Sequence, residues 1–303
     1  MANDDSEPDL SHAREPPPRA LTRLSPLVRR LAAPNASPFT FNGTCTYIVG
    51  EGAVAIVDPG PDDDSHLSAM LAAVEGERVE TILVTHTHRD HSPGAKRLRA
   101  ATGARVVGAA PFVAAGDGTA GLDSAHDRDY SPDAVLADGE RLQGQGYSVE
   151  AVATPGHCSN HLCFALVDEN ALFSGDHVMA WSTSVVAPPD GSMRAYMASL
   201  EKLRGRGETV YWPGHGGPVV EPERYVRALI LHRRQREASI LAALKEGPQT
   251  IPALVAKIYV GIDPSLTRAA GLSTLAHLED LGERRLVAAE AREGGEEARY
   301  RLS

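Results

Sequence analysis

The stretch Thr81-Ile82-Leu83-Val84-Thr85-His86-Thr87-His88-Arg89-Asp90-His91 places three histidines and an aspartate directly after a short apolar run. The run Thr81–Val84 is typical of a buried strand, because it is short, apolar and rich in β-branched residues. His86 and His88 are two residues apart, so an extended chain points both imidazoles to one side. We therefore expect these two side chains to share one metal ion.

The chain turns toward a predicted helix at Asp90 and His91, which can face a second metal ion. The alternative is a polar loop whose residues share no role. His157 in Thr-Pro-Gly-His, Asp176 in Ser-Gly-Asp and His215 in Pro-Gly-His-Gly each follow a predicted strand. Taken alone, each is a weak signal, because a single histidine at a strand end is more often a surface or hydrogen-bonded residue than a ligand. Polar residues at several strand ends are nevertheless typical of sheet-based enzymes.

Short strands and helices are predicted around these residues. Two β-rich runs, Thr46–Val49 and Ala53–Val57, flank the turn Gly50-Glu51-Gly52 and predict a hairpin. Helices are expected near Ser65–Glu75 and Gly94–Ala101. Further strands are expected at Ala104–Val107, Ser148–Val152, Leu162–Val167, Ala171–Phe173 and Thr209–Tyr211.

The C-terminal part has a different pattern. Pro222–Glu246 predicts a long helix that ends at Gly247-Pro248, and three short helices are expected at Thr250–Tyr259, Ser265–Gly271 and Leu272–Leu281. Two strands, Leu286–Glu290 and Ala298–Leu302, follow. Helices followed by a terminal hairpin predict a winged helix. We expect a disordered tail over residues 1–20, a domain that carries the histidine cluster over 21–221 and a winged-helix domain over 222–303.

Composition and charge limit the possible partners. A chain of 303 residues with 42% hydrophobic residues can form one large core and a small second domain. The formal net charge of −10 argues against extensive coating of nucleic acid or attachment to an anionic membrane. Three cysteines do not suggest a disulfide framework, and the acidic N-terminus does not resemble a signal peptide. We expect a soluble, cytoplasmic protein.

The whole set of motifs resembles the metallo-β-lactamase superfamily, in which His-x-His-x-Asp-His is followed by separate His, Asp and His ligands. The resemblance implies an α/β fold, the four-layered αββα sandwich, and two Zn²⁺ ions per chain. Carried over by position, the ligands of one zinc ion are His86, His88 and His157, the ligands of the other are Asp90, His91 and His215, and Asp176 bridges them. Asp90 is also expected to take part in catalysis.

Asp58, which ends the second strand of the predicted hairpin, matches the remaining motif of the superfamily. The resemblance implies that it holds the ligand loop by hydrogen bonds. Without the resemblance, an aspartate that forms a turn before Pro59-Gly60 is an equally good interpretation. Cys158 and Cys163 are expected to be core residues rather than ligands, because the ligand set is already complete.

Three further segments, Ala33–Thr40, Ser174–Met179 and His232–Glu237, are similar to the β-lactamase-like-2 branch of this superfamily. That branch joins the hydrolase domain to a C-terminal winged helix and includes an endoribonuclease specific for single strands. The resemblance thus implies a zinc-dependent hydrolase that acts on single-stranded RNA. Cys45 departs from the pattern, because relatives often carry Asn there.

Several arginines could contact RNA phosphates. They are Arg233, Arg234, Arg236, Arg284 and Arg285. The alternative for these residues is a solvated helix face. The alternative activity is hydrolysis of a small ester, lactone or thioester, as in glyoxalase II, and hydrolysis of β-lactams is less favoured. A non-enzymatic nucleic-acid binder is also less favoured, since structural zinc sites are normally closed and rich in cysteine.

Overall fold

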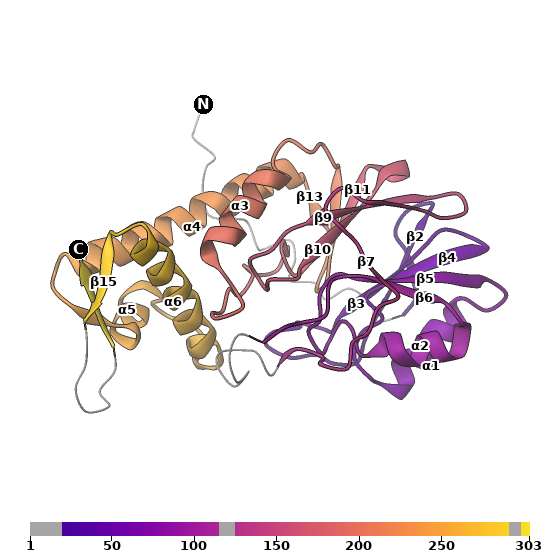
Figure 1. The fold of residues 1–303 in the computed structure, drawn as a ribbon, viewed down its shortest axis with the longest axis horizontal. Helices are drawn as coiled ribbons and strands as arrows, with labels where there is room; N and C mark the ends of the chain where they lie inside the picture. The colour runs from indigo at the N-terminus through magenta and orange to yellow at the C-terminus, as the bar shows by residue number, and fades with distance from the viewer. Residues whose placement is uncertain (1–19, 115–124, 291–297) are drawn as a thin grey trace.

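The computed structural model describes residues 20–114, 125–290 and 298–303. Within these ranges two mixed β-sheets pack face to face, and a small third sheet lies near the C-terminus (Figure 1). The first sheet has the order β1-β2-β3-β4-β5-β6-β7, the second β13-β12-β11-β10-β9-β8 and the third β14-β16-β15. The expected tail, residues 1–20, lies almost entirely outside the described residues.

The strands of the two large sheets are short and mostly buried. Those of the first sheet are β1 (Thr22–Arg23), β2 (Val28–Ala32), β3 (Cys45–Val49), β4 (Ala53–Val57), β5 (Arg78–Val84), β6 (Arg105–Gly108) and β7 (Ala134–Val135). Those of the second are β8 (Arg141–Gln143), β9 (Ser148–Ala153), β10 (Leu162–Leu166), β11 (Ala171–Gly175), β12 (Val210–Pro213) and β13 (Val219–Val220).

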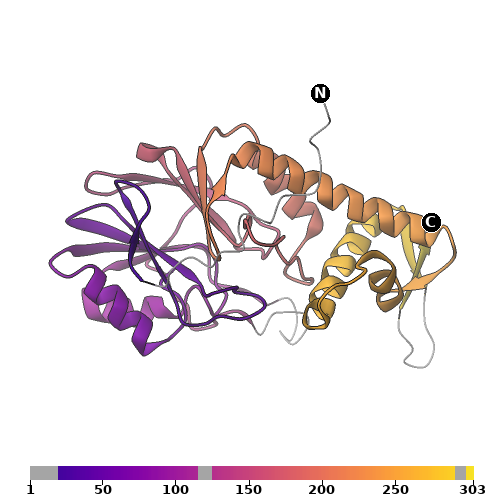
Figure 2. The same ribbon diagram turned by 180° about the vertical axis from the view of Figure 1, so that it is seen from behind.

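Helices cover the outer face of each sheet (Figures 1 and 2). One apolar cluster joins the first sheet to α1 (Asp64–Ala73) and α2 (Gly94–Thr102). A second cluster fills the space between the two sheets. A third joins the second sheet to α3 (Met193–Leu203) and to the first half of α4 (Pro222–Leu244). The four-layered αββα sandwich predicted for this chain is therefore confirmed.

Strand direction brings the predicted site residues together. β4, β5 and β6 are mutually parallel, and so are β11 and β12. The carboxyl ends of β4, β5, β9, β11 and β12 carry, in that order, Asp58, the His86–His91 loop, His157, Asp176 and His215. The sheets thus hold residues from five distant segments at one edge.

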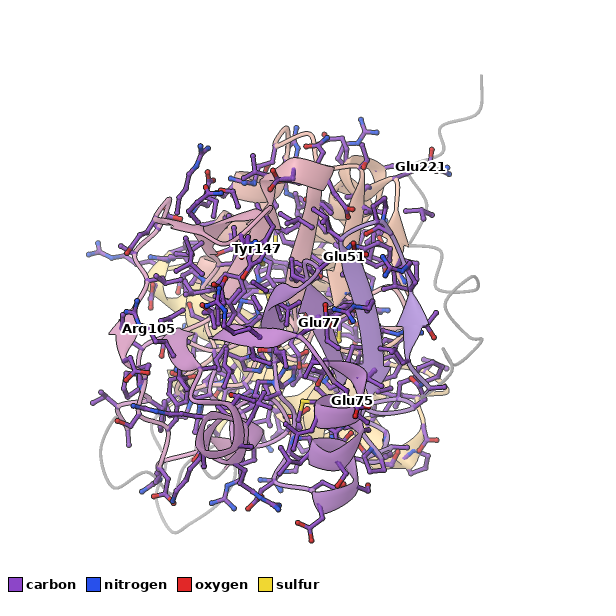
Figure 3. The ribbon with its side chains drawn as sticks, turned by 90° about the vertical axis from the view of Figure 1, so that its right-hand side faces the viewer. Glu51, Glu75, Glu77, Arg105, Tyr147 and Glu221 are labelled. Carbon is purple, nitrogen blue, oxygen red and sulfur yellow. The ribbon has the colours of Figure 1, made fainter. Side chains whose placement is uncertain are left out.

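At the opposite edge of the first sheet, side-chain contacts close the turns between strands. There, at the amino ends of β4 and β5, Glu77 accepts a hydrogen bond from the Gly52 backbone N–H, at 2.8 Å, and pairs with Arg29 at 2.7 Å. Figure 3 shows Glu77 and Glu51 on this side of the molecule. These contacts close the turns between strands and leave the other edge for function.

The C-terminal part has the predicted winged-helix elements, with one correction. The third sheet consists of β14 (Gln249–Thr250), β15 (Val287–Glu290) and β16 (Arg299–Leu302), and α5 spans Ile251–Ile258. The two short helices expected from Ser265 to Leu281 are instead one helix, α6 (Thr267–Glu283), after a 3₁₀ turn, η4 (Pro264–Leu266). Gly271 costs a helix about 1 kcal/mol, and the buried face from Ala269 to Leu281 offsets that cost.

The long helix α4 belongs to two cores. Val226, Leu229 and Ile230 pack against the second sheet, whereas Ile240 and Leu244 pack with α5, α6 and β15. The expected domain division at residue 221 therefore stays a prediction, because the helix that follows it is continuous with both parts. In the described part of the chain, no helix has the length and hydropathy needed to cross a bilayer.

Candidate metal centre

Seven side chains predicted as ligands converge at the carboxyl edge of the sheets. His88 Nδ1 lies 3.1 Å from Nε2 of His86 and 3.1 Å from Nε2 of His157. A carboxylate oxygen, Oδ2 of Asp176, lies 3.7 Å from His157 Nε2. These four atoms form one group of nitrogen and oxygen donors.

The second group faces the other oxygen of Asp176. Its Oδ1 lies 3.3 Å from His215 Nε2 and 3.4 Å from His91 Nε2. Asp90 Oδ2 lies 3.2 Å from His215 Nε2 and 3.3 Å from His91 Nε2. Asp176 thus presents one oxygen to each group, and its role as a bridging ligand, which the resemblance implies, stays a prediction.

Hydrogen bonds fix which ring nitrogen of His86 and of His157 faces the ligand group. The Thr85 hydroxyl donates to Asp58 Oδ2 at 2.7 Å, so it can only accept from His86 Nδ1, at 3.0 Å. His157 Nδ1 donates to the Val185 carbonyl at 2.6 Å, because a carbonyl only accepts. In both rings Nδ1 carries a proton, and Nε2 is the nitrogen that faces the ligand group.

Asp58 anchors the loop His86–His91, which we call the ligand loop, through three contacts. Its Oδ1 accepts from the Thr85 backbone N–H at 2.8 Å, and its Oδ2 accepts from the Thr85 hydroxyl and from His91 Nδ1, at 2.9 Å. Asp58 itself has a φ of 50° at the end of β4, a left-handed conformation that aspartate tolerates better than most residues. The position supports the predicted supporting role rather than a simple turn.

The second group places two histidines against two carboxylates. Burial favours neutral forms, yet the positive charges of His91 and His215 hold the pKa of Asp90 well below its usual range. Burial likewise opposes charge on His215, but Asp176 and Asp90 raise its pKa to about 9. For His91, Asp90, Asp176 and Asp58 overcome burial and raise the pKa well above its ordinary value. In this arrangement protons on the two histidines balance the carboxylates.

The first group has the opposite tendency. Burial, together with the neighbouring histidines, holds the pKa of His86 and of His88 well below the ordinary value. Both rings are therefore neutral near pH 7, with lone pairs available. Neutral imidazole and carboxylate are ligands that Zn²⁺ accepts readily.

The geometry fits a bound cation. Nε2 of His91 and Oδ1 of Asp176 are buried and lack a hydrogen-bond partner in this structure, although they lie 3.4 Å apart. Leaving such groups unsatisfied in the interior is costly, and a metal ion between them removes the cost. Cys158 also lies near His86 and His88, but burial raises the pKa of its thiol well above the usual value and disfavours the thiolate.

Two further histidines, His161 and His177, lie beside the predicted ligands. His161 accepts from the Asp176 backbone N–H at 3.1 Å and holds the Thr154 hydroxyl at 2.8 Å, so it supports the bridging residue and does not line the pocket. His177 is fully buried, and neither ring nitrogen has a partner among the described residues.

A network that the sequence did not predict supports the ligand loop from the other side. His126 Nδ1 lies 2.8 Å from the Thr87 hydroxyl, between the ligands His86 and His88, and its Nε2 lies 3.2 Å from Asp190. Asn160 donates to the same Thr87 hydroxyl at 2.8 Å. Nothing in the spacing around His126 or Asp190 points to this contact, because it joins segments far apart in the chain.

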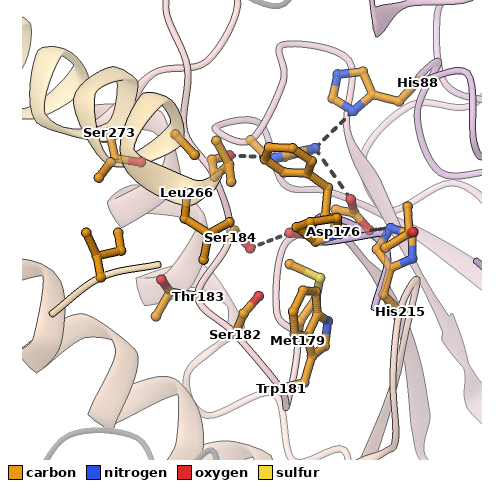
Figure 4. Close-up of a pocket in the computed structure, with 18 of the residues that line it drawn as sticks. His88, Asp176, Met179, Trp181, Ser182, Thr183, Ser184, His215, Leu266 and Ser273 are labelled. Atoms are coloured by element: carbon orange, nitrogen blue, oxygen red, sulfur yellow. Dashed lines mark hydrogen bonds and ion pairs between the residues drawn. The ribbon is translucent and has the colours of Figure 1, made fainter. Parts of the chain in front are cut away.

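A cavity of about 410 Å³ opens on the ligand groups (Figure 4). The site residues at its boundary are His88, Asp90, His157, Asp176 and His215. Most of its remaining wall is apolar and comes from both parts of the chain. The apolar residues are Pro38, Phe39, Ala125, Met179, Trp181, Val185, Ile262, Leu266, Ala269 and Ala270.

Comparisons with known proteins agree with this geometry. Residues 39–215 match the model of the metallo-beta-lactamase superfamily, and residues 250–295 match the beta-lactamase associated winged helix domain. A beta-lactamase-like protein 2 homolog from Caenorhabditis elegans is 31% identical over 88% of this chain and 86% of that protein. An atrochrysone carboxyl ACP thioesterase from Aspergillus fumigatus is 34% identical over 73% of this chain and 66% of that protein.

Solved structures show the same fold. A metallo-beta-lactamase family protein from Thermus thermophilus superposes with a TM-score of 0.74 at 25% identity, covering 93% of this chain and all of that one. A beta-lactamase domain protein from Burkholderia ambifaria gives a TM-score of 0.79 at 19% identity, covering 96% and 97%. The chain therefore belongs to the metallo-β-lactamase superfamily of hydrolases and carries its associated winged helix domain.

Proposed function

We propose that this chain is a zinc-dependent hydrolase that cleaves a carboxylic thioester or ester whose acyl group is largely apolar. The observation that carries the proposal is the apolar wall of the cavity that opens on the ligand groups. A pocket with apolar walls and few polar groups favours small molecules that bury most of their surface. The thioesterase name of one relative supports the same reaction class.

In this proposal two zinc ions occupy the two ligand groups. His86, His88 and His157 would hold one ion, Asp90, His91 and His215 would hold the other, and Asp176 presents one oxygen to each group. Bound metal would polarise a substrate carbonyl and lower the pKa of a water molecule. A cation would also replace the protons on His91 and His215 that balance the carboxylates.

The side chains have separate tasks around the reacting carbonyl. Asp90 lines the cavity and directs Oδ2 to His91 and His215, so we assign its Oδ1 to accept a hydrogen bond from the attacking water. Trp181, stacked on Phe41 with ring centroids 5.0 Å apart, forms a rigid wall that excludes bulk water. The apolar residues of η4 and α6 orient the acyl group from the opposite side.

Hydrolysis of single-stranded RNA is the second candidate, because the likeness to the beta-lactamase-like protein 2 homolog extends through most of the chain. The arginines predicted to contact phosphates favour it less. Arg233 is 3% exposed and donates to the Ser184 carbonyl. Arg234 pairs with Glu201 at 3.1 Å, and Arg284 pairs with Glu237 at 2.7 Å. Arg234 and Arg284 thus pair with acids of the chain itself, and Arg233 is too buried to contact a polyanion.

The test is a comparison of zinc-loaded protein on acetyl and octanoyl thioesters of N-acetylcysteamine and on labelled single-stranded RNA. We expect the octanoyl thioester to have a kcat/KM about tenfold or more above that of the acetyl thioester, since it fills the apolar wall. RNA should stay intact. Cleavage of RNA without cleavage of either thioester would overturn the proposal.

A matched pair of variants locates the acyl group. Ala269→Phe fills the cavity from α6 and should lower kcat/KM for the octanoyl thioester about tenfold, with a smaller effect on the acetyl thioester. Thr267→Phe, at an exposed position two residues earlier, should change neither. Equal losses on both substrates in the Ala269→Phe variant would contradict placement of the acyl group in this cavity.

A further inference from the structure

A buried arginine without a carboxylate partner lines the same cavity. Arg233 of α4 is 3% exposed, donates from one terminal nitrogen to the Ser184 carbonyl, and has its guanidinium 5.1 Å from the centre of the Tyr196 ring. Its Nε has no hydrogen-bond partner, and no ion pair joins it to any acid among the described residues. A charge this deeply buried is normally paired, because removing it from water costs several kcal/mol.

The neighbouring His232 adds a second unpaired donor. Its Nε2 lies 3.3 Å from Arg236 Nε, and a guanidinium can only donate, so Nε2 is the acceptor. Burial, together with the charges of Arg233 and Arg236, lowers the pKa of His232 to about 4, which makes the ring neutral. The remaining proton therefore sits on Nδ1, which is buried and has no partner in the part of the chain that the structure describes. His232 also lines the cavity.

Among the described residues that line the cavity, no acid outside the ligand groups faces these donors. Burial, together with the charge of Arg233, lowers the pKa of His277 in α6 to about 3, so this ring is neutral. Neither of its ring nitrogens has a partner among the described residues. The acids that line the cavity, Asp90 and Asp176, belong to the ligand groups. The described wall near Arg233 therefore has an excess of donors and positive charge.

The C-terminal elements and the ligand groups line different sides of the cavity. Leu266 and Ser273, from the C-terminal elements, lie on the side away from His88 and His215 (Figure 4). Ser184 lies between the two regions, since its carbonyl accepts from Arg233 while its hydroxyl donates to the Asp176 carbonyl. A ligand that reaches both regions passes the apolar wall on the way.

We propose that Arg233, assisted by His232, binds a carboxylate at the distal end of the acyl group, so that the substrate is a carboxylated acyl thioester or ester. This inference rests on the proposed function. A planar carboxylate matches the guanidinium fork, and its negative charge compensates the buried cation. The apolar wall then contacts the methylene or ring portion that separates the carboxylate from the scissile carbonyl.

Matched thioesters test the specificity. N-acetylcysteamine thioesters of butanoate, hexanoate and octanoate are compared with those of succinate, adipate and suberate, which end in a carboxylate. For at least one length, we expect the carboxylated substrate to have a KM about tenfold lower than its uncharged counterpart. The Arg233→Met variant should bring that ratio close to one, and Arg233→Lys should restore part of it.

Arg234→Met is the control, because Arg234 is the next residue on α4 but is exposed and pairs with Glu201. It should keep the wild-type preference. Melting temperatures show whether each variant folds. Because Arg233→Met removes an unpaired buried charge, we expect it to be at least as stable as the wild type. A preference for carboxylated substrates that survives in Arg233→Met would overturn the inference.

Direct binding gives a readout that does not depend on turnover. Calorimetric titration of the zinc-loaded protein with adipate, hexanoate and inorganic phosphate should show that Arg233→Met raises the Kd of adipate about tenfold and that Arg234→Met leaves it unchanged. Equal adipate affinity in all three proteins would overturn the carboxylate site. Binding of phosphate with the same dependence on Arg233 would also overturn it, in favour of a general anion site.

The outcomes separate the two proposals. If adipate binding depends on Arg233 but no thioester is cleaved, the proposed function fails and the anion site stands. If uncharged and carboxylated thioesters are cleaved equally well and adipate binding does not depend on Arg233, the function stands and the anion site fails.

Discussion

His91 Nδ1 lies 2.9 Å from Asp58 Oδ2, and both side chains are almost completely inaccessible to solvent. The contact joins the end of β4 to the ligand loop after β5, across 33 positions in the chain. A carboxylate behind an imidazole fixes the ring orientation and increases the basicity of the nitrogen that faces a metal. The tightness of metal binding should therefore depend on a residue that is not itself a ligand.

The variant Asp58→Asn keeps the shape of this residue but removes its charge. We expect metal affinity to fall by about 10–100-fold, with a parallel loss of hydrolysis at limiting zinc. Competition with a chromogenic chelator measures the affinity. Asp62→Asn is the matched control, because Asp62 is exposed and pairs with Arg97. An Asp58→Asn protein with wild-type metal affinity would contradict the supporting role.

The pair His126 and Asp190 should act in a similar way from the other side of the ligand loop. Asp190→Asn weakens the contact to His126, which in turn holds the Thr87 hydroxyl. We predict a loss of metal affinity of about tenfold for Asp190→Asn and a similar loss for His126→Ala. The double variant should lose little more than either single variant, because the residues act through one chain of contacts. The exposed Asp129→Asn is the control, and additive losses would contradict a shared network.

Gly156, just before His157, has a φ of 144° and no room for a side chain. A Cβ there would lie 2.3 Å from the Tyr196 Cα. Gly156→Ala should lower the free energy of unfolding by about 2–4 kcal/mol, from backbone strain and overpacking together. Gly205→Ala, at a φ of 73° with open space around it, should cost only about 1–2 kcal/mol. Denaturant unfolding measures both, and equal losses would show that the close approach to α3 is unimportant.

Acid should destabilise the protein through buried neutral histidines, of which His66 is a clear case. Burial lowers its pKa from 6.5 to about 4 despite the nearby charge of Asp63, and its Nε2 lies 2.8 Å from the Thr46 hydroxyl. Between pH 6.5 and 4 the unfolded chain binds a proton at this histidine that the folded chain does not bind. The free energy of unfolding therefore falls as the pH falls. The slope from this group is at most about 1.4 kcal/mol per pH unit.

The measurement is denaturant unfolding at several pH values for the wild type and His66→Gln. Between pH 6.5 and 4, the free energy of unfolding should change less steeply with pH in His66→Gln, because one titrating group is missing. Ser68→Gln, at an exposed position on the same helix, should keep the wild-type slope. A His66→Gln slope equal to that of the wild type would place the titration elsewhere.

Local pattern was enough to predict the elements that hold the site. The run Thr81–Val84 is the end of β5, and the hairpin predicted from Thr46 to Val57 is formed by β3 and β4. These segments are short, apolar and bounded by turn residues, so their conformation follows from neighbours in sequence. The helix break expected near Gly271 was wrong, because tertiary burial along α6 outweighs a single glycine.

The residues of His86–His91 already indicated metal chemistry, because donor type and spacing are properties of the sequence itself. Only the tertiary structure decided what surrounds that chemistry. It brought His126 and Asp190 behind the ligand loop, and it buried Arg233 in the cavity wall instead of exposing it to a polyanion. Burial and pairing depend on contacts between segments far apart in the chain, and local periodicity cannot specify such contacts.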